Sequence, residues 1–442
     1  MTTAKARARK RDAPPPNAPP DTPPPDTGGA RMRVGILSQW YPPEPAFIPG
    51  ELARELATRG HEVRVLTAFP SYPEGRVYAG YRQRWNDRTT TGSITVRRVP
   101  AYPSHDNSAA RRVASYLSFA ATSSLAGLRY LNGVDAIYVY HPPPTAYAAA
   151  GLLQLARRIP TVLHVQDMWP ESVTASTMAP GGRAGSALHR ALAASMRRLY
   201  RAASGIAVIA PSMAALLIER GADPGKVRTV LNWTDENLFR PVPATAAARR
   251  AIGHRDRCTV MFAGNLGPFQ RVETAVRAAA AAGDRMDLVI LGSGTQEPAL
   301  RQLARQLRAT NVRFLGHRPA QEMASLYAAA EYQLLTLRDL PALRGTVPSK
   351  LQAALACGRP VIASAAGDVA RLVESAGAGL TCAPENWQKL AETFLTAAAT
   401  PPAQRAETGR RALALYQDRM SLRVGVDQIE DMLAKVGTRE AV

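Results

Sequence analysis

Short apolar runs alternate with amphipathic stretches along most of this chain, and this alternation is the feature that most limits how it can fold. The runs RVGILS, EVRVLTA, ITVRRV, DAIYVY, TVLHVQ, GIAVIA and RTVLN follow one another between residues 33 and 232. Most are separated by stretches with helical periodicity, the first from about Pro49 to Arg59. Buried parallel strands have nearly continuous apolar sequences. The pattern therefore predicts a doubly wound parallel α/β sheet.

The alternation breaks once and then starts again. A polar, proline-flanked stretch at about 240–256 precedes the runs TVMFAGN, MDLVILGSG, VRFLG, YQLLTL, PVIAS and GLTCA, which end near residue 383. We therefore expect two Rossmann-like domains, 31–240 and 241–420. Ligands of open α/β sheets bind where the carboxyl ends of the strands meet, so we expect a central cleft between the two domains.

The two ends of the chain differ from this pattern. Residues 1–30 begin with a basic run and hold eight prolines between Pro14 and Pro25. Such a segment buries too little apolar surface to offset the entropy of ordering, so a disordered tail is expected. At the other end, amphipathic helices are expected over about 402–418 and 421–435. The segment 421–442 could cross back to brace the first domain.

Composition argues against several classes of protein. There is no run of 18 uninterrupted apolar residues, and the first residues lack the apolar core of a secretory signal. The three cysteines, Cys258, Cys357 and Cys382, form no CxxC pair, which fits a reducing compartment. We expect a cytoplasmic protein with no membrane-spanning helix, able at most to contact the inner membrane face from the cytoplasmic side.

The net charge of +20 needs a cautious interpretation. Only six of the 55 basic residues are lysines, an arginine bias that indicates high-GC codon usage, typical of an actinobacterial gene, more than selection for phosphate contacts. The arginines are scattered and do not alternate with aromatic residues, as a base-stacking platform would require. We expect no nucleic-acid partner. Attraction to acidic substrates or anionic lipid headgroups fits the charge better.

Glycines follow two successive strands of the second domain. Gly264-Asn265-Leu266-Gly267 comes directly after TVMFA, and Gly292-Ser293-Gly294 ends the next run. Such turns let backbone N–H groups approach a phosphate, although a tight turn without a ligand has the same sequence. Neither is a GxGxxG, and no acidic residue closes the second strand, which argues against a dinucleotide-dependent dehydrogenase.

A third candidate is the loop Gly345-Thr346-Val347-Pro348-Ser349-Lys350, which leads into the helix LQAALACG. Ser349 is suited to be the N-cap. A lysine in the first turn has the wrong sign for the helix dipole unless an anion binds there. A solvated surface lysine is the plain alternative. We favour a phosphate ligand at Lys350.

Polar residues also follow a strand of the first domain, in His164-Val165-Gln166-Asp167-Met168-Trp169-Pro170-Glu171. Asp167 and Glu171 could serve as an acid/base pair or hold sugar hydroxyls, and His164 could take part in catalysis. The alternatives are ordinary loop carboxylates and a satisfied buried histidine. No metal-ligand spacing, GxSxG or GxxxxGK[ST] occurs, so we expect neither a metal site nor a serine hydrolase or P-loop enzyme.

These segments together resemble a known family. RVGILSQWYPPEP, HVQDMWPES, FAGNLG, LGSG, VRFLGH and VPSKLQAALACGRPVIA, in this order, are similar to the retaining nucleotide-sugar glycosyltransferases of family 4, in the subgroup of colanic-acid and O-antigen transferases. The resemblance covers about residues 31–435. It implies the GT-B architecture, with a nucleotide-sugar donor on the C-terminal domain, the acceptor on the N-terminal domain, and no cofactor or metal.

The sequence departs from the family in two places. Many relatives have an arginine and a lysine where this chain has Asn265 and Gln270, and most have two glutamates where it has Gly345 and Ala353. Lys350 with the amides of the loop before it is then the expected partner of the diphosphate. We expect further donor contacts from Gly264, Asn265, Gly267, Gln270, Gly292, Gly294, Leu315, His317, Thr346, Val347, Pro348 and Ser349. We expect acceptor contacts from Gly50, Tyr72, His141 and Trp169.

The sequence thus predicts a metal-independent glycosyltransferase that retains anomeric configuration, with Asp167, Glu171, His164 and Lys350 as the catalytic candidates. Two alternatives are a GT-B-shaped sugar-nucleotide epimerase and a non-catalytic binding protein. The acceptor could be a lipid-linked saccharide or a small natural-product intermediate. For the lipid case, the stretch 186–203 could form a basic amphipathic helix on anionic lipid, or an ordinary surface helix with a solvated arginine face.

Overall fold

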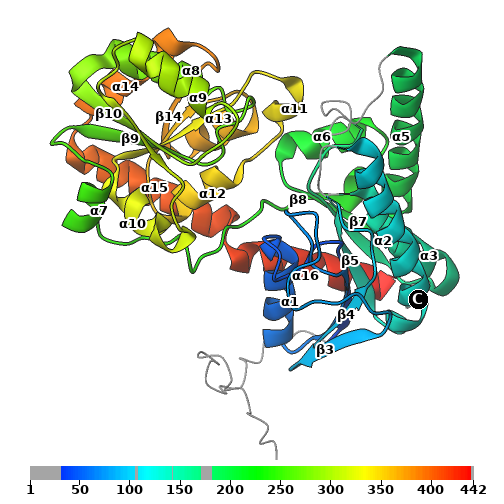
Figure 1. Ribbon diagram of the computed structural model, residues 1–442. Coiled ribbons are helices and arrows are strands. Elements are labelled where there is room, and N and C mark those ends of the chain that lie inside the picture. The colour runs from blue at the N-terminus through cyan, green and yellow to red at the C-terminus, as the bar shows by residue number, and fades with distance from the viewer. Residues whose placement is uncertain (1–30, 105–107, 142, 171–181, 440–442) are drawn as a thin grey trace, which may run out of the picture.

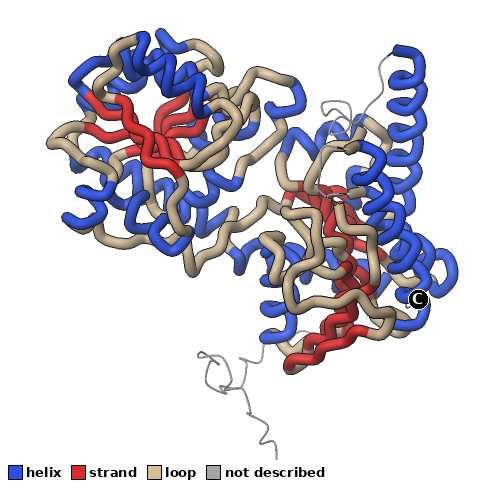
Figure 2. Tube along the Cα trace, viewed as in Figure 1, coloured by secondary structure: helices blue, strands red, loops and turns tan. Residues whose placement is uncertain are grey.

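The computed structural model describes residues 31–104, 108–141, 143–170 and 182–439 and has two α/β lobes (Figure 1). The predicted tail, residues 1–30, and the candidate Glu171 lie outside the described residues. The N-terminal lobe has an eight-stranded sheet with the order β3-β4-β2-β1-β5-β6-β7-β8. The C-terminal lobe has a six-stranded sheet with the order β11-β10-β9-β12-β13-β14. Figure 2 shows the two sheets as separate red cores, and each lobe has the alternating strands and helices expected of a Rossmann-like domain.

The apolar runs of the sequence form strands, and those in the middle of each sheet, such as β6, β9 and β10, are buried along their whole length. The strands of the first sheet are β1 (Arg33–Leu37), β2 (Glu62–Ala68), β3 (Asp87–Thr91), β4 (Ile94–Val99), β5 (Ala136–His141), β6 (Thr161–Val165), β7 (Gly205–Val208) and β8 (Val227–Thr229). Those of the second are β9 (Cys258–Ala263), β10 (Met286–Leu291), β11 (Val312–Gly316), β12 (Tyr332–Thr336), β13 (Val361–Ser364) and β14 (Gly379–Cys382).

One strand, β3, was not predicted from the sequence. β3 pairs antiparallel with β4 at the edge of the first sheet, so this sheet is not wholly parallel. Its sequence, DRTTT, has no apolar residue, and four of its five positions are exposed. An edge strand without a buried face gives no periodic signal to find.

Helices cover both faces of each sheet, as alternating strands and helices require. Those of the first lobe are α1 (Phe47–Thr58), α2 (Ala109–Tyr130), α3 (Tyr147–Arg157), α5 (Gly182–Ala202) and α6 (Pro211–Glu219). Those that follow are α7 (Ala246–Ala251), α8 (Val272–Ala282), α9 (Glu297–Gln306), α10 (Met323–Ala329), α11 (Pro341–Arg344), α12 (Ser349–Ala356), α13 (Asp368–Ser375), α14 (Trp387–Ala399), α15 (Pro402–Arg419) and α16 (Leu422–Arg439). The stretch 240–256, expected to be a linker, contains α7, which Thr245 caps by accepting a hydrogen bond from the Ala248 N–H.

The last helix packs on the first sheet. Val426, Ile429 and Leu433 of α16 share an apolar cluster with Ile36 and Leu52, and α16 contacts β5, β6, β7 and α1. In Figure 1 the red helix lies across the N-terminal lobe. The helices α1 and α16 therefore cover one face of this sheet, whereas α2, α3, α5 and α6 cover the other.

Candidate functional site

Two glycine turns meet at the carboxyl ends of β9 and β10. The Leu266 N–H donates a hydrogen bond to the Ser293 carbonyl, at 2.9 Å. A Cβ on Gly292 would stand 1.9 Å from the carbonyl oxygen of Gly264, and Gly292 has a φ of 124°. Only glycine fits such a backbone position. The two turns therefore form one continuous backbone surface at the edge of the C-terminal sheet.

Lys350 places its ammonium group beside this surface. Its Nζ lies 4.0 Å from the ring centroid of Phe262 and 3.1 Å from where a Cβ on Gly264 would stand. The Nζ atom is buried and has no hydrogen-bond partner among the described residues. Burial lowers the pKa of Lys350 to about 8. A buried cation without a partner is costly, so this position favours an anionic ligand.

The loop before Lys350 differs from the sequence prediction in one detail. α12 begins at Ser349, and Pro348 takes the N-cap position, so the predicted N-cap role of Ser349 is wrong. The Thr346 hydroxyl donates to the Ala342 carbonyl, and Val347 is buried. Since Pro348 has no N–H, the free backbone N–H groups at the start of α12 belong to the following residues.

Side chains of the first glycine turn close around Gly267. A Cβ on Gly267 would stand 2.9 Å from Asn265 Nδ2 and 3.0 Å from Gln270 Oε1, and one on Gly294 would stand 2.7 Å from Asn265 Oδ1. Gln270 Oε1 is buried without a hydrogen-bond partner in the described structure. The structure thus brings together the two glycine turns, Asn265, Gln270 and Lys350.

Two other expected donor contacts lie farther along the sheet edge. Leu315 is half-buried in β11, and His317 is exposed directly after that strand. β11 is separated from β9 by β10, so both residues stand one strand beyond the glycine turns. They could reach only a part of a ligand that extends along the edge.

Aromatic side chains gather at the carboxyl ends of the N-terminal sheet. The rings of Trp40 and Tyr72 lie 5.1 Å apart, in the loops after β1 and β2. Tyr116 of α2 meets the ring of Trp169 edge-on, with 6.5 Å between centroids. Parallel neighbouring strands β2, β1, β5 and β6 bring these loops to one edge. Tyr72 and Trp169 were among the acceptor contacts expected from the sequence, whereas Trp40 and Tyr116 were not.

Asp167 lies among these rings, two residues after β6. Its side chain is exposed to solvent at the sheet edge, yet the surrounding protein raises its pKa above the ordinary value by desolvation. Its charge in turn raises the pKa values of Tyr116 and Tyr140, which burial raises first, so both rings are near it. This carboxylate can accept a hydrogen bond from a hydroxyl group that is held against the aromatic rings.

His164 does not reach this surface. It is fully buried, with Nδ1 2.6 Å from the Tyr138 hydroxyl and Nε2 3.1 Å from Gln166 Nε2. Burial lowers the pKa of His164 to about 3. This placement agrees with the alternative of a satisfied buried histidine, because the alternation within β6 turns the side chain into the core and toward a protein partner. The catalytic role of His164 stays a prediction.

Gly50 and His141, the two remaining acceptor candidates, are both buried. A Cβ on Gly50 would stand 2.4 Å from Pro42 Cγ, so Gly50 lets α1 pack closely on the loop after β1. His141 ends β5, is fully buried, and has no hydrogen-bond partner for either ring nitrogen in the described residues. Burial lowers the pKa of His141 to about 4. Unlike His164, it leaves two polar atoms unsatisfied at the sheet edge.

Glu44, which holds two loops of this edge together, was not identified from the sequence. Glu44 is buried in the loop after β1 and accepts hydrogen bonds from the N–H groups of Tyr41, Ser71 and Tyr72. It therefore ties the loop after β1 to the loop after β2 and sets the position of Tyr72. A lone glutamate in the segment YPPEP was the only signal, and it does not differ from an ordinary loop residue.

A buried carboxylate joins the two lobes beside the donor loop. The Ser212 N–H, at the start of α6, donates to Asp368 Oδ2 at 2.9 Å, and its hydroxyl donates to Oδ1 at 3.1 Å. Asp368 is the first residue of α13 in the C-terminal lobe. Because its carboxylate accepts from the Ser212 N–H, it caps the N-terminus of α6 in the opposite lobe. A Cβ on Gly345 would stand 3.3 Å from Ser212 Cβ, which places the loop that leads to Lys350 against α6.

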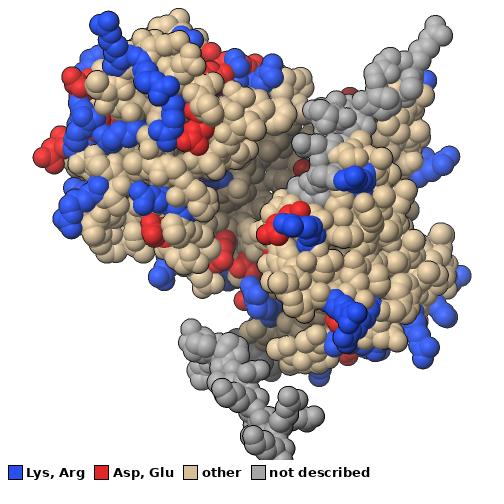
Figure 3. All heavy atoms as spheres, in the orientation of Figure 1, with Lys and Arg blue, Asp and Glu red and all other residues tan. Residues whose placement is uncertain are grey.

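The described part of the chain contains neither a cluster of metal ligands nor a membrane-spanning helix. No three His, Cys, Asp or Glu side chains gather there in an arrangement that could hold a metal ion. Among the described helices, none is both long and apolar enough to cross a membrane. Figure 3 shows a hollow between the two lobes.

Comparison with known proteins agrees with this geometry. Residues 48–233 match the Glycosyl transferase 4-like domain, and residues 257–399 match Glycosyl transferases group 1. The chain is 28% identical over 343 residues to WcaI of Escherichia coli K12, a protein assigned as a colanic acid biosynthesis glycosyl transferase, covering 76% of this chain and 83% of WcaI. It is 32% identical over 207 residues to a D-inositol 3-phosphate glycosyltransferase of Kribbella flavida, covering 44% of this chain and 47% of that protein.

Solved structures share the fold. Anabaena HepE in complex with UDP and glucose superposes with a TM-score of 0.64 at 19% identity, covering 92% of this chain and all of HepE. A sucrose-phosphate synthase of Thermosynechococcus elongatus superposes with a TM-score of 0.69 at 18% identity and covers 92% of this chain and 100% of its own.

Proposed function

The chain belongs to the family-4-like glycosyltransferases of GT-B fold, and we propose that it transfers a sugar from a nucleoside diphosphate to an acceptor hydroxyl with retention of the anomeric configuration and without a metal ion. The donor would bind at the glycine turns of the C-terminal lobe. The acceptor would bind at the aromatic edge of the N-terminal lobe. The observation that carries this proposal is the buried ammonium group of Lys350 beside Gly264, which has no hydrogen-bond partner among the described residues.

Lys350 would neutralise the diphosphate. As the bond between the anomeric carbon and the phosphate oxygen breaks, negative charge accumulates on the leaving diphosphate. A cation already buried at that point stabilises the charge without reorganisation. Backbone N–H groups of the two glycine turns and of the first turn of α12 would share this task. The phosphate partner would also raise the pKa of Lys350 and keep it protonated.

Asp167 would orient the acceptor. Its carboxylate accepts a hydrogen bond from the attacking hydroxyl, and the rings of Tyr116 and Trp169 hold the apolar faces of the acceptor. Attack from the side of the departing phosphate, which takes the proton, retains the configuration. This route needs a cation at the phosphate and a hydroxyl-orienting group in the opposite lobe, and Lys350 and Asp167 are suited to these two roles.

The test separates the proposal from an epimerase or a binding protein. The purified chain is incubated with a panel of nucleoside diphosphate sugars without an acceptor, and the products are followed by NMR. A transferase slowly releases free sugar with unchanged anomeric configuration, and Lys350→Ala abolishes the release. An epimerised sugar nucleotide, or no reaction with any donor, would refute the proposal. Chelator at saturating concentration should leave the rate unchanged.

A further inference from the structure

Two segments of the chain connect the lobes, and they are joined to each other by hydrogen bonds. Residues 230–245 run from β8 to α7, which packs on α10 of the C-terminal lobe, and the second connection joins α15 to α16. Glu236 of the first segment accepts hydrogen bonds from the Tyr416 hydroxyl of α15, at 2.9 Å, and from the Leu422 N–H of α16, at 2.8 Å. The two connections therefore form one hinge, and a movement of the first segment moves the second.

Trp233 fixes the first segment to the N-terminal lobe. Its side chain is buried and lies against α16, where a Cβ on Gly425 would stand 2.4 Å from the indole Cε3. The indole N–H donates a hydrogen bond to Glu51 Oε2 of α1, at 2.6 Å. Gly425 thus makes room for the ring, and the carboxyl group of Glu51 is the hydrogen-bond acceptor that locates it.

Asn232, next to Trp233, connects the hinge to the acceptor edge. Its Nδ2 donates a hydrogen bond to Gln166 Oε1 at 2.7 Å, and Gln166 Nε2 donates to Asn232 Oδ1 at 3.2 Å. Gln166 directly precedes Asp167 in the loop after β6. A change in the position of Trp233 therefore reaches the loop that carries the proposed acceptor-orienting carboxylate.

The carboxyl group of Glu51 is in a position that disfavours a negative charge. Glu51 is 5% exposed, and its ion-pair partner Arg54, at 3.7 Å, has a side chain that is 61% exposed. Burial raises the pKa of Glu51 to about 7, against the hydrogen bond from Trp233 and the charge of Arg54, and the negative charges of Asp235 and Glu236 add to the rise. The arrangement of the hinge seen here therefore favours the neutral carboxyl group at pH values at which a hydrated glutamate is ionised.

The elements around Glu51 also carry Tyr41 in the loop after β1, Tyr416 on α15 and Asp427 on α16. Burial raises the pKa values of both tyrosines, so they are neutral near pH 7. Asp427 forms an ion pair with Arg59 of α1 at 2.7 Å. In this cluster the carboxyl group of Glu51 is therefore placed to change its charge near neutral pH.

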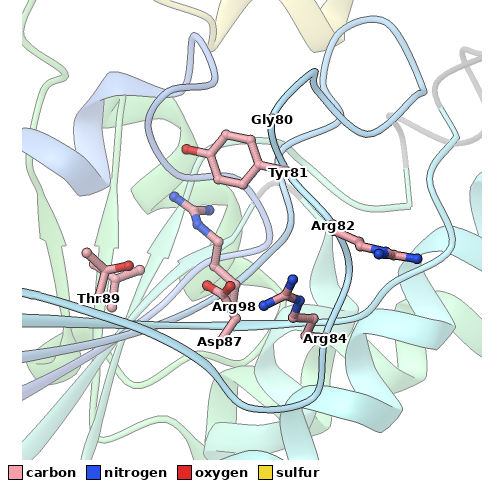
Figure 4. Close-up of a pocket in the computed structure, with 8 residues that line it drawn as sticks. Gly80, Tyr81, Arg82, Arg84, Asp87, Thr89 and Arg98 are labelled. Atoms are coloured by element: carbon pink, nitrogen blue, oxygen red, sulfur yellow. The ribbon is translucent and has the colours of Figure 1, made fainter. Parts of the chain in front are cut away.

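Arg98, another buried charged residue of the N-terminal lobe, is stabilised differently. Figure 4 shows its guanidinium group beside the Tyr81 ring, in a pocket that Asp87 also lines. Arg98 donates hydrogen bonds to two backbone carbonyl groups, and Asp87 has the opposite charge. Glu51 has like charges beside it instead, so the fold stabilises the charge of Arg98 and opposes that of Glu51.

We propose that Glu51 and Trp233 form a proton-operated latch of the hinge between the lobes. When Glu51 is neutral, its carboxyl group holds Trp233 in the arrangement seen here. When Glu51 is ionised, repulsion from Asp235 and Glu236 and the need of the buried charge for water displace the first segment from α1, and the lobes move apart. Because the donor and acceptor edges belong to opposite lobes, the latch sets the pH range in which the two edges meet.

Ionisation of Glu51 should favour the opened hinge as the pH rises. In the latched arrangement the pKa of Glu51 is about 7, and in an opened one that hydrates the side chain it returns toward the ordinary value of 4.5. Below this value the carboxyl group is neutral in both arrangements, and the latched one keeps its full advantage. Between the two pKa values this advantage should fall by up to about tenfold per pH unit, and above the higher one it should not change further.

The test measures the distance between the lobes of the full chain, without any ligand, by double electron–electron resonance of two spin labels. The labels are attached to Ser195→Cys of α5 and Gln306→Cys of α9, both exposed, in a Cys382→Ser background, because the other two cysteines are buried. We expect one main distance at about pH 5 and a longer component that grows as the pH rises toward about 7. In Glu51→Gln, whose amide stays neutral, the distribution should remain that of low pH throughout.

Three further variants separate the latch from a general effect of pH. Trp233→Phe keeps an aromatic ring but loses the hydrogen bond to Glu51, so the longer component should already be present at low pH. Asp235→Asn removes a like charge and thereby lowers the pKa of Glu51, so the change in distance should be smaller and end at lower pH. Glu55→Gln makes the same substitution as Glu51→Gln one turn along α1, and this control should respond as the unchanged chain does.

Several outcomes would overturn the proposal. They are a distance that does not depend on pH, a pH response that persists in Glu51→Gln, an equal loss of response in Glu55→Gln, and a response that disappears altogether in Asp235→Asn, which would assign the titration to Asp235. Circular dichroism at both ends of the pH range checks that each variant folds, and Asp235→Asn decides the matter if Glu51→Gln does not. Since no sugar donor enters these measurements, their failure would leave the proposed function untouched.

Discussion

The two lobes present different surfaces at the carboxyl ends of their sheets. In the C-terminal lobe the surface is mostly backbone, made by Gly264, Gly267 and Gly292 around one lysine. In the N-terminal lobe it is made of large side chains, such as Trp40, Tyr116 and Trp169, around one carboxylate. The same strand-and-helix plan therefore supports two kinds of recognition.

The difference follows from the ligands proposed for each lobe. A diphosphate has many acceptor oxygens and little shape, so close backbone N–H groups and a cation suffice, and glycine is needed because a Cβ would fill the space. An acceptor is recognised by its rings and hydroxyl groups, which require side chains of a defined shape. If this division is correct, changes in the two lobes should affect different kinetic constants.

The largest expected effect is that of Gly292→Ala. The new Cβ would stand 1.9 Å from the Gly264 carbonyl oxygen at a φ of 124°, so both glycine turns must move. Strain of this kind costs on the order of 1–3 kcal/mol for the backbone conformation alone, and with the displaced turns we expect at least a hundredfold weaker binding of nucleoside diphosphates in calorimetric titration. Gly225→Ala, where a Cβ meets only Asp223 Oδ1 at 3.4 Å, is the control and should bind normally.

Lys350→Ala should cause the second largest loss of nucleoside diphosphate affinity. A charge-assisted contact contributes about 1.5–3 kcal/mol, so nucleoside diphosphate affinity should fall roughly tenfold to a hundredfold. Lys389→Ala is the control, because that lysine is exposed and pairs with Glu392. An unchanged dissociation constant for the Lys350 variant would remove the lysine from the donor site and leave the backbone alone in that role.

The affinity should also depend on pH through Lys350. In the free protein burial lowers its pKa to about 8, and a bound diphosphate raises this pKa. Below pH 8 the lysine is protonated in both states and affinity is at its maximum. Above pH 8 the free protein must first take up a proton, so affinity should fall by about tenfold per pH unit until the pKa of the complex is reached. The fall should be absent in Lys350→Ala, as isothermal titration across this range would show.

The two lobes also differ in how much of them the sequence predicted. The strands were found because buried apolar runs are continuous in sequence, and the glycine turns because each follows its strand directly. Asp167 and Trp169 lay in one such loop. Trp40, Glu44 and Tyr116 were missed because their partners lie in other segments: Trp40 and Glu44 of the loop after β1 contact the loop after β2, and Tyr116 of α2 meets Trp169.

For His164, the sequence left open the direction in which the side chain points. A histidine near a strand end can turn toward the cleft or into the core, and the period of two within β6 decides between them. The sequence does not show that Tyr138 and Gln166 occupy its two ring nitrogens. Likewise, the antiparallel pairing of β3 with β4 could not be predicted, because β3 has no apolar residue.

Asp167→Asn tests the role proposed for the N-terminal lobe. The amide can still accept a hydrogen bond but lacks the negative charge, so the orientation of the acceptor hydroxyl weakens by about 1.4 kcal/mol, roughly a tenfold loss of kcat. Nucleoside diphosphate affinity should not change, because the residue lies in the other lobe. If donor binding fell as much as kcat did, the division of roles between the lobes would be wrong.

The smallest expected effect tests the contact that joins the lobes. In Asp368→Asn the negative charge at the start of α6 and α13 is lost, and with it the ion pair to Arg371, while an amide NH2 replaces one of the two oxygens that accept from Ser212. A single hydrogen bond contributes about 0.5–1.5 kcal/mol, so we expect KM for the donor sugar nucleotide to rise a few-fold. The dissociation constant for the nucleoside diphosphate alone should change less, because it binds one lobe. Since the Ser212 hydroxyl is the partner, Ser212→Ala should produce the same change, and the double variant should add nothing further. Additive losses would mean that Asp368 acts on the loop before Lys350 within its own lobe and not through the contact between lobes.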